Sequence, residues 1–451
     1  MREFELPLYG IINFDNQKEL QVRFYKDSKE NFRLELLNDF GDFGFGAYDL
    51  QAKFESNGFV NYITFINCYK INLKEKRQIR FDGFISYENF IDKNNELYIN
   101  TSSLRNKISF TINNLERWIY PHMDICSELE CELLDENGIK TKNKTKAKYF
   151  KMLTLNYQET FTFQYLGEQI KLSIINDFER LAIDFPKIEL YPYLHLDLET
   201  EIEHNIDFYI DIILQLRNLF SLFLNQTGNI SSIYELEYCS YRIDYYLINE
   251  KYNNTDLILQ NYNIYFKDIR TNFNQILQKW FDIYDKYELI INSICNYEYP
   301  KYVSDAINKR AQLLETYGNI KTKGEKSRND IITAIKEIKP SNLIDIFHLN
   351  KGEGDFLLFN FNLSELDSDF DKLVAKFGNQ IMNIRNHFIH PYKNGSRKTP
   401  EDDNINNIFL FDNGKLKLKA VKILTNYLEK ALIVLLLQEL NIDQYYRNLK
   451  Y

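Results

Sequence analysis

Residues 1 to about 200 alternate between apolar and polar positions with a period of two, which is typical of half-buried β-strands. Asparagine, aspartate and glycine separate the alternating segments, as turns require. Several short strands with such turns predict a β-rich domain, built as a sandwich or a barrel. The pattern is clearest in LQVRFYK (20–26), VNYITFINCYKINL (60–73), QIRFDGFIS (78–86), KISFTI (107–112), TFTFQYL (160–166) and QIKLSII (169–175).

From about residue 205 the apolar period lengthens to that of helices. The first helical segment, 205–229, has Gly228 as a C-cap and is followed by a strand-like segment at 234–248. The fold class is therefore α+β, with a β-rich N-terminal domain over 1–265, helical in its C-terminal part, and an all-α helical bundle over 266–451. In the second domain we expect helices at 272–297, 301–317, 327–338, 362–389 and 416–440.

The predicted helix 362–389 carries an apolar stripe and ends in a cluster of polar residues before Pro391. At about 100° per residue, Arg385 lies about 70° from the centre of the stripe, and His390 about 140° around from Arg385. One straight helix could hardly bring both side chains to one phosphate. Either the chain unwinds at His390, which Pro391 favours, or a second copy of the helix supplies the convergence, which predicts a homodimer. The stripe consists of Leu363, Leu366, Phe370, Leu373, Phe377, Ile381, Ile384 and Phe388.

The polar residues at this helix end are those that metal-free RNA cleavage requires. The ribose 2′-OH attacks the adjacent phosphate, while a histidine takes or gives a proton and an arginine holds the phosphate oxygens. His390 is the candidate acid or base, Arg385 the candidate phosphate stabiliser, and Asn386 a supporting donor. The alternative is a solvated helix end whose histidine interacts with the C-terminal dipole.

Composition and charge indicate the compartment in which the protein works and the kind of partner that it binds. Five scattered cysteines argue for reduced thiols and a cytoplasmic protein. The longest apolar run, ALIVLLL (431–437), is too short to span a bilayer, and the N-terminus has no secretory signal, so we expect no membrane association. Net charge is −9, but residues 277–451 hold 25 Lys and Arg against 23 Asp and Glu, while the rest hold 30 against 41. An anionic partner is therefore expected at the C-terminal part.

Further ligand candidates surround the helix end. Tyr392 could stack on a base, although a packing role is more common for such a tyrosine. Lys393, Arg397 and Lys398 could guide an RNA backbone, although ordinary solvated faces explain most such basic residues. In the β-rich part, His122, Cys126 and Cys131 lie close in sequence. A zinc site usually has four ligands in tighter pairs, so we predict no metal and no cofactor.

The sequence RNHFIHP (385–391), at the end of a penultimate bundle helix, resembles the R-N-x-x-x-H motif of HEPN ribonucleases. The N-terminal part is similar to the ApeA family, bacterial anti-phage proteins with a β-rich domain before a HEPN domain, through ISFTINNLERWI (108–119) and RNLFSLFLNQTGNISSI (217–233). The resemblance implies a homodimer whose paired motifs form one RNase cleft, used in abortive infection. It places catalysis on Arg385, Asn386 and His390, and leaves His387 at a variable position.

Two alternatives to a nuclease remain open. The bundle could act without catalysis, as a dimerisation or interaction module, or it could be the HEPN partner of a separate nucleotidyltransferase. The expected partners are an RNA substrate of unknown class, with transfer RNA as one candidate, a phage-derived trigger, and a second copy of the chain.

Overall fold

The structure is a computed structural model of the 451-residue chain. It divides into two compact units, one of residues 1–217 and 229–257 and one of residues 218–228 and 258–451. The boundary expected at residues 265 and 266 stays a prediction. The structure describes residues 7–14, 18–26, 32–37, 48–56, 59–73, 76–80, 83–89, 104–119, 126–134, 140–150, 158–184, 187–225, 228–236, 242–247, 262–295, 303–323, 330–346, 370–389, 392–393, 396–397, 411–412, 415–416 and 418–446.

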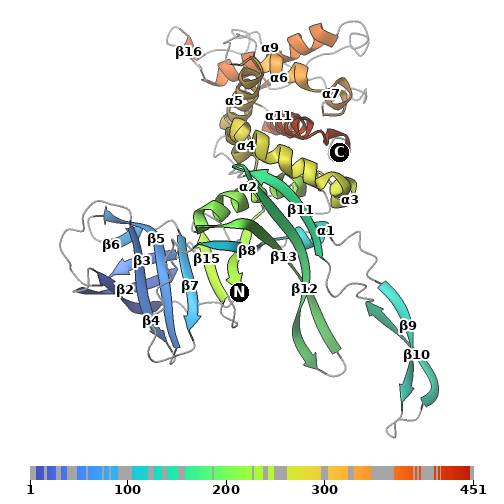
Figure 1. Ribbon diagram of the computed structural model, residues 1–451. Helices are drawn as coiled ribbons and strands as arrows, with labels where there is room; N and C mark the ends of the chain where they lie inside the picture. Colours follow the sequence, from blue (N-terminus) through green and yellow to red (C-terminus); the bar gives the residue numbers. More distant parts are fainter. Residues whose placement is uncertain are drawn as a thin grey trace. The chain divides into compact units, whose positions relative to one another are not determined.

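The first unit is built on an antiparallel sheet (Figure 1). All six predicted strand segments lie in strands, and segment 78–86 is divided between two of them. Among the described strands, thirteen join this sheet, in the order β11-β12-β13-β8-β14-β15-β7-β5-β4-β1-β2-β3-β6, and β9 (Cys126–Leu134) pairs separately with β10 (Lys140–Phe150). The thirteen are β1 (Leu8–Phe14), β2 (Lys18–Lys26), β3 (Phe32–Leu36), β4 (Tyr48–Ser56), β5 (Phe59–Leu73), β6 (Lys76–Arg80), β7 (Gly83–Asn89), β8 (Arg105–Ile112), β11 (Gln158–Tyr165), β12 (Glu168–Asp184), β13 (Lys187–His204), β14 (Ile230–Leu236) and β15 (Arg242–Leu247).

One end of this sheet closes on itself. The first part of β5 pairs with β4 and β7, and its last part pairs with β6, so strands β5-β4-β1-β2-β3-β6 form a ring. Phe24, Phe54 and Phe65 of these strands are fully buried, and the Phe24 ring lies 5.2 Å from that of Phe65 and 6.2 Å from that of Phe54. A closed ring leaves these strands without an unpaired edge.

The other end of the sheet is covered on one face by helix α2 (Ile206–Leu224) (Figure 1). Ile108, Leu172 and Leu198 are fully buried on the same side of three neighbouring strands. The Tyr209 hydroxyl of α2 donates to the Arg105 carbonyl at 2.8 Å and contacts Thr200 Oγ1 at 2.7 Å. The face that α2 leaves uncovered carries polar residues, as alternation along the strands requires.

The second unit is helical, which confirms the α+β fold class. Leu432 and Leu436 lie on one side of helix α11 and Val434 on the opposite side, and all three are buried, so the apolar run 431–437 lies in the core of this unit. The described part of the chain contains no helix long and apolar enough to cross a membrane. The helices are α3 (Phe266–Ile269), the 3-10 turn Arg270–Asn272, α4 (Phe273–Cys295), α5 (Val303–Lys321), α6 (Asp330–Glu337), α7 (Pro340–Ile346), α9 (Phe370–Ile389), α11 (Leu418–Glu439) and the 3-10 turn Asp443–Tyr445.

Each of the five helices expected in this unit has a counterpart, although residues 362–369 lie outside the described part. The pattern missed the short helices α7 and, in the first unit, α1 (Leu115–Ile119). It also treated 234–248 as one strand-like stretch, whereas β14 ends at Leu236 and β15 begins at Arg242. Short elements carry too few residues for a period to be recognised.

Gly318 lies where α5 meets the start of α6, and a Cβ atom there would overlap the backbone carbonyl oxygen of Asp330. Alanine normally stabilises a helix by about 1 kcal/mol relative to glycine. Here the overlap is with backbone that cannot rotate away, so we expect Gly318→Ala to lower the free energy of unfolding by about 1–3 kcal/mol. Urea denaturation measures this. Asn319→Ala, at the exposed next position, is the control and should be neutral or slightly stabilising.

Candidate active site at the end of helix α9

Helix α9 packs closely on α6 at a glycine. A Cβ atom on Gly378 would lie 2.5 Å from Cγ1 and 3.1 Å from Cα of Ile332. Val374, Ile381 and Ile384 are buried on the α9 surface around this glycine. The close approach fixes the distance between α9 and α6. It therefore also fixes the position of side chains further along α9.

Arg385 lies in line with this packed face. Positions 374, 378, 381 and 385 are separated by steps of four, three and four, so they share one side of the helix. The expected apolar stripe omitted Val374 and Gly378, which lie on the Arg385 side of it. The centre of the packed face therefore lies closer to Arg385 than the centre of the expected stripe does. The Arg385 side chain is only 23% exposed. Its Nε atom is buried, without a hydrogen-bond partner among the described residues.

Glu315 of α5 forms an ion pair with Arg385. The distance from Arg385 Nη2 to Glu315 Oε2 is 2.8 Å, and the Glu315 side chain is 39% exposed. A guanidinium has five N–H donors. A carboxylate that engages one amino nitrogen orients the group and leaves other N–H donors for a ligand such as a phosphate.

The other residues of the motif lie in different surroundings. Asn386 is exposed, whereas His387 is only 8% exposed and its ring centre lies 5.8 Å from that of Phe388. Burial of His387 fits a packing role. His390 lies outside the described residues, which end in this helix at Ile389. The convergence of Arg385 and His390 therefore stays a prediction.

A two-stranded ladder follows the helix. Strand β16 (Tyr392–Lys393) pairs with β17 (Ser396–Arg397), with Tyr392 opposite Arg397 and Lys393 opposite Ser396. The sequence between the strands is Asn-Gly, the dipeptide favoured in two-residue hairpin loops. Three of the four candidate RNA-binding residues thus belong to one hairpin directly after α9. The fourth, Lys398, lies outside the described residues.

Helix α5, which carries Glu315, is anchored on α11 through charged groups. Glu439 accepts hydrogen bonds from the Tyr317 hydroxyl at 2.5 Å and from Lys321 Nζ at 2.6 Å. Burial raises the pKa of the Tyr317 hydroxyl well above its ordinary value. Burial alone would raise the pKa of Glu439, but hydrogen bonds from Lys321 and Tyr317 lower it below the ordinary value. The Tyr317 proton therefore stays in place, and the contact fixes α5.

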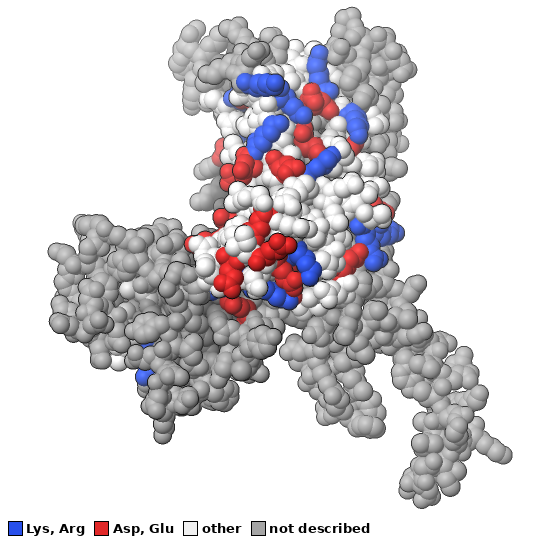
Figure 2. All heavy atoms as spheres, viewed as in Figure 1, with Lys and Arg blue, Asp and Glu red and all other residues white. Residues whose placement is uncertain are grey.

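A second pair, Arg310 to Glu429 at 2.7 Å, adds to this anchoring. On the face that Figure 2 shows, the described lysine and arginine side chains of the helical unit are interspersed with aspartate and glutamate. Among the described residues of this unit, cations such as Arg310 and Lys321 are paired with carboxylates, so these residues do not form a uniformly positive surface.

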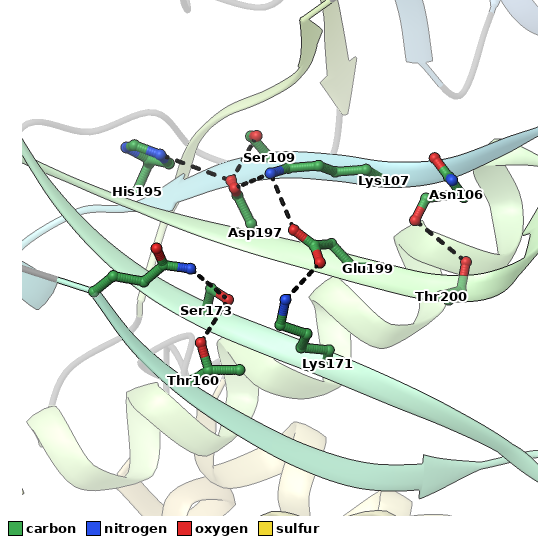
Figure 3. Close-up of polar contacts among 11 residues, drawn as sticks. Asn106, Lys107, Ser109, Thr160, Lys171, Ser173, His195, Asp197, Glu199 and Thr200 are labelled. Atoms are coloured by element: carbon green, nitrogen blue, oxygen red, sulfur yellow. Dashed lines mark hydrogen bonds and ion pairs between the residues drawn. The ribbon is translucent and has the colours of Figure 1, made fainter.

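The polar face of the first unit contains a series of ion pairs over three strands (Figure 3). Asp197 of β13, whose side chain is 3% exposed, accepts from Ser109 Oγ at 2.7 Å and pairs with Lys107 Nζ at 2.7 Å. Glu199 bridges Lys107 at 3.1 Å and Lys171 at 2.8 Å, and the hydrogen bond from Lys171 lowers the Glu199 pKa. These contacts link β8, β13 and β12 in one register. Ser109 is the residue of the first segment of the family resemblance that takes part in them.

The second segment of the family resemblance, 217–233, connects α2 to its surroundings. Asn218 Nδ2 donates to the Tyr284 hydroxyl at 2.7 Å and to Asn292 Oδ1 at 2.9 Å, both on α4. Ser221 Oγ accepts from the Gly228 amide at 2.7 Å and so holds the turn after the helix. A buried amide side chain with two partners fixes α4 against the end of α2.

The two segments also meet each other. The Asn113 amide donates to the Asn229 carbonyl at 2.9 Å, where β8 pairs with β14. These contacts explain why both stretches are recognisable as sequence: their polar residues make specific hydrogen bonds and their apolar residues, such as Trp118 and Ile108, are fully buried.

Sequence reasoning missed Glu315. It lies 70 positions before Arg385, on another helix, and nothing in a local spacing connects the two residues. Of the rejected zinc ligands, His122 lies outside the described residues, and Cys126 and Cys131 lie on β9.

The family model described as ApeA N-terminal domain 1 matches residues 7–280, well over half of the chain. This range includes both segments on which the family resemblance was based. No curated protein matches the chain, and no solved structure does. On the extent of the family match, the chain belongs to the ApeA N-terminal domain 1 family.

Proposed function

We propose that the chain is a metal-independent endoribonuclease of bacterial anti-phage defence, acting by abortive infection, with its catalytic centre at the end of α9. Membership of the ApeA family supports the defence role. The observation that carries the nuclease is Arg385, half-buried in line with the packed face of α9 and oriented by Glu315 at 2.8 Å. An arginine fixed in this way suits a phosphodiester.

In the proposed reaction the ribose 2′-oxygen attacks the adjacent phosphorus and the bond to the 5′-oxygen breaks. Arg385 stabilises the charge that develops on the phosphate oxygens. His390 transfers a proton, and the exposed Asn386 donates a hydrogen bond to the substrate. Tyr392, Lys393, Arg397 and Lys398 contact the RNA next to the cleaved bond. The active form is a homodimer in which two motifs face one cleft.

We expect cleavage of RNA to persist in EDTA and to leave 2′,3′-cyclic phosphate or 3′-phosphate ends. Proton transfer by His390 and charge stabilisation by Arg385 are the roles that this mechanism gives to side chains, so it gives no role to a divalent ion. The measurement is incubation of the purified chain with total cellular RNA in EDTA, followed by mapping of both ends.

An Arg385→Ala variant, purified in parallel, controls for contaminating nucleases. Products with 3′-hydroxyl ends, or a strict requirement for Mg²⁺, would contradict the proposal. A chain that never cleaves RNA but co-purifies with a nucleotidyltransferase in equal amount would favour the two-component alternative. An inert His390→Ala substitution with unchanged toxicity to cells would favour a non-catalytic interaction protein.

A further inference from the structure

The proposed reaction needs two proton transfers, and its mechanism so far names one group for them. The 2′-hydroxyl must lose a proton as it attacks, and the 5′-oxygen must gain one as it leaves. In an in-line displacement, the attacking and leaving oxygens lie on opposite sides of the phosphorus. The base and the acid must therefore lie on opposite sides of the phosphate.

We infer that Glu315 is the general base of the site, an inference that rests on the proposed function, and that His390 is the general acid. Glu315 contacts the arginine that would hold the phosphate, at 2.8 Å, from a helix other than α9. His390 is about 140° around the helix axis from Arg385 if α9 stays regular. If α9 stays regular, a phosphate bound by Arg385 has the Glu315 carboxylate beside it and His390 on another side.

Exposure and rigidity fit this role. The Glu315 side chain is 39% exposed and that of Arg385 23%, so the carboxylate is the more accessible member of the pair. Its helix is fixed by the contact of Gly318 with Asp330 and by the hydrogen bond from Tyr317 to Glu439. A base held on a rigid helix lies next to the phosphate-binding group, which is the region where the 2′-hydroxyl must lose its proton.

The reaction moves two protons and exchanges one bond to phosphorus for another. Glu315 takes the 2′-hydroxyl proton, the 2′-oxygen forms a bond to phosphorus, and the bond from phosphorus to the 5′-oxygen breaks. The His390 imidazolium gives its proton to the leaving 5′-oxygen. The products are a 2′,3′-cyclic phosphate and a 5′-hydroxyl, and exchange with water returns both side chains to their starting states.

The test is Glu315→Gln, which keeps a hydrogen-bond acceptor for Arg385 but cannot take the proton. We expect kcat to fall by about 10²- to 10⁴-fold. KM and the melting temperature should stay close to wild type. Glu315→Asp should restore part of the rate, since it keeps the carboxylate. Glu337→Gln is the matched control, because Glu337 is 45% exposed and lies 3.9 Å from Lys321 rather than near Arg385.

Two results separate this inference from the proposed function. If wild type cleaves RNA, Arg385→Ala does not, and Glu315→Gln keeps a kcat close to wild type, Glu315 only positions Arg385 and the inference fails alone. If wild type does not cleave RNA under any condition that triggers toxicity in cells, the proposed function fails and the inference fails with it.

Discussion

Replacing Arg385 with alanine is expected to lower kcat for RNA cleavage by about 10²- to 10³-fold, as the loss of a hydrogen-bond donor to the transition state does in known hydrolases. The guanidinium binds phosphate oxygens through paired N–H groups, which no neutral side chain replaces. Arg385→Lys should recover only part of the rate, since an ammonium is a point charge without the planar fork. Single-turnover kinetics on a defined RNA measures both variants.

Stability should change little in Arg385→Ala. The Glu315 carboxylate that loses its partner is 39% exposed, and such a pair contributes about 0–1 kcal/mol. Arg310→Ala is the comparison variant. The Arg310 side chain is 4% exposed, and its loss leaves the partly buried Glu429 carboxylate without this ion pair. That variant should lose more stability than Arg385→Ala. Equal losses of stability in the two variants, or an active Arg385→Ala, would remove Arg385 from the catalytic role.

The histidines provide a second comparison. His390→Ala should lower cleavage at least as strongly as Arg385→Ala, since it removes the general acid. His387→Ala should keep substantial activity per folded molecule, although burial of this ring means that the variant can lose stability. If His387→Ala is as inactive as His390→Ala while remaining folded, the assignment of the acid is wrong.

Much of the fold could be predicted from the sequence because apolar and polar positions alternate along many of its strands. The segment 60–73 predicted β5 to within one residue, since most of its odd-numbered positions are apolar or aromatic, namely Ile63, Phe65, Tyr69, Ile71 and Leu73. The ring that β5 closes could not be predicted. It depends on the pairing of Tyr69–Leu73 with β6 while the preceding residues pair with β4, and alternation is the same whichever strand lies alongside.

The candidate site was predictable only in part, for a reason that Gly378 illustrates. An apolar stripe is counted from large side chains, so a glycine that lets two helices approach is scored as a gap. Gly378 lies on the packed face against Ile332, and including it places Arg385 in line with that face rather than at its boundary. The partner Glu315 comes from another helix, and only the packing of α5, α6 and α9 brings it within 2.8 Å.

Mixing two inactive variants should restore activity, if the cleft is shared between two chains. Arg385→Ala retains His390, and His390→Ala retains Arg385 and Glu315. When the two variants are present in equal amounts and pair at random, half of the dimers are mixed. One of the two Arg385–His390 combinations in each mixed dimer is intact. About a quarter of the wild-type sites should therefore return. The measurement is RNA cleavage by the co-expressed, co-purified pair, compared with each variant alone.

The control is Arg385→Ala mixed with the double variant Arg385→Ala/His390→Ala, in which no chain supplies Arg385 and no activity should return. Recovery in the first mixture alone requires that Arg385 from one chain act with His390 from its partner. This arrangement resolves the 140° of arc between the two residues on a regular helix without distorting either copy. If mixed dimers form but remain inactive, or if light scattering finds a fully active monomer, each site lies within one chain, and α9 must unwind before Pro391 to complete it.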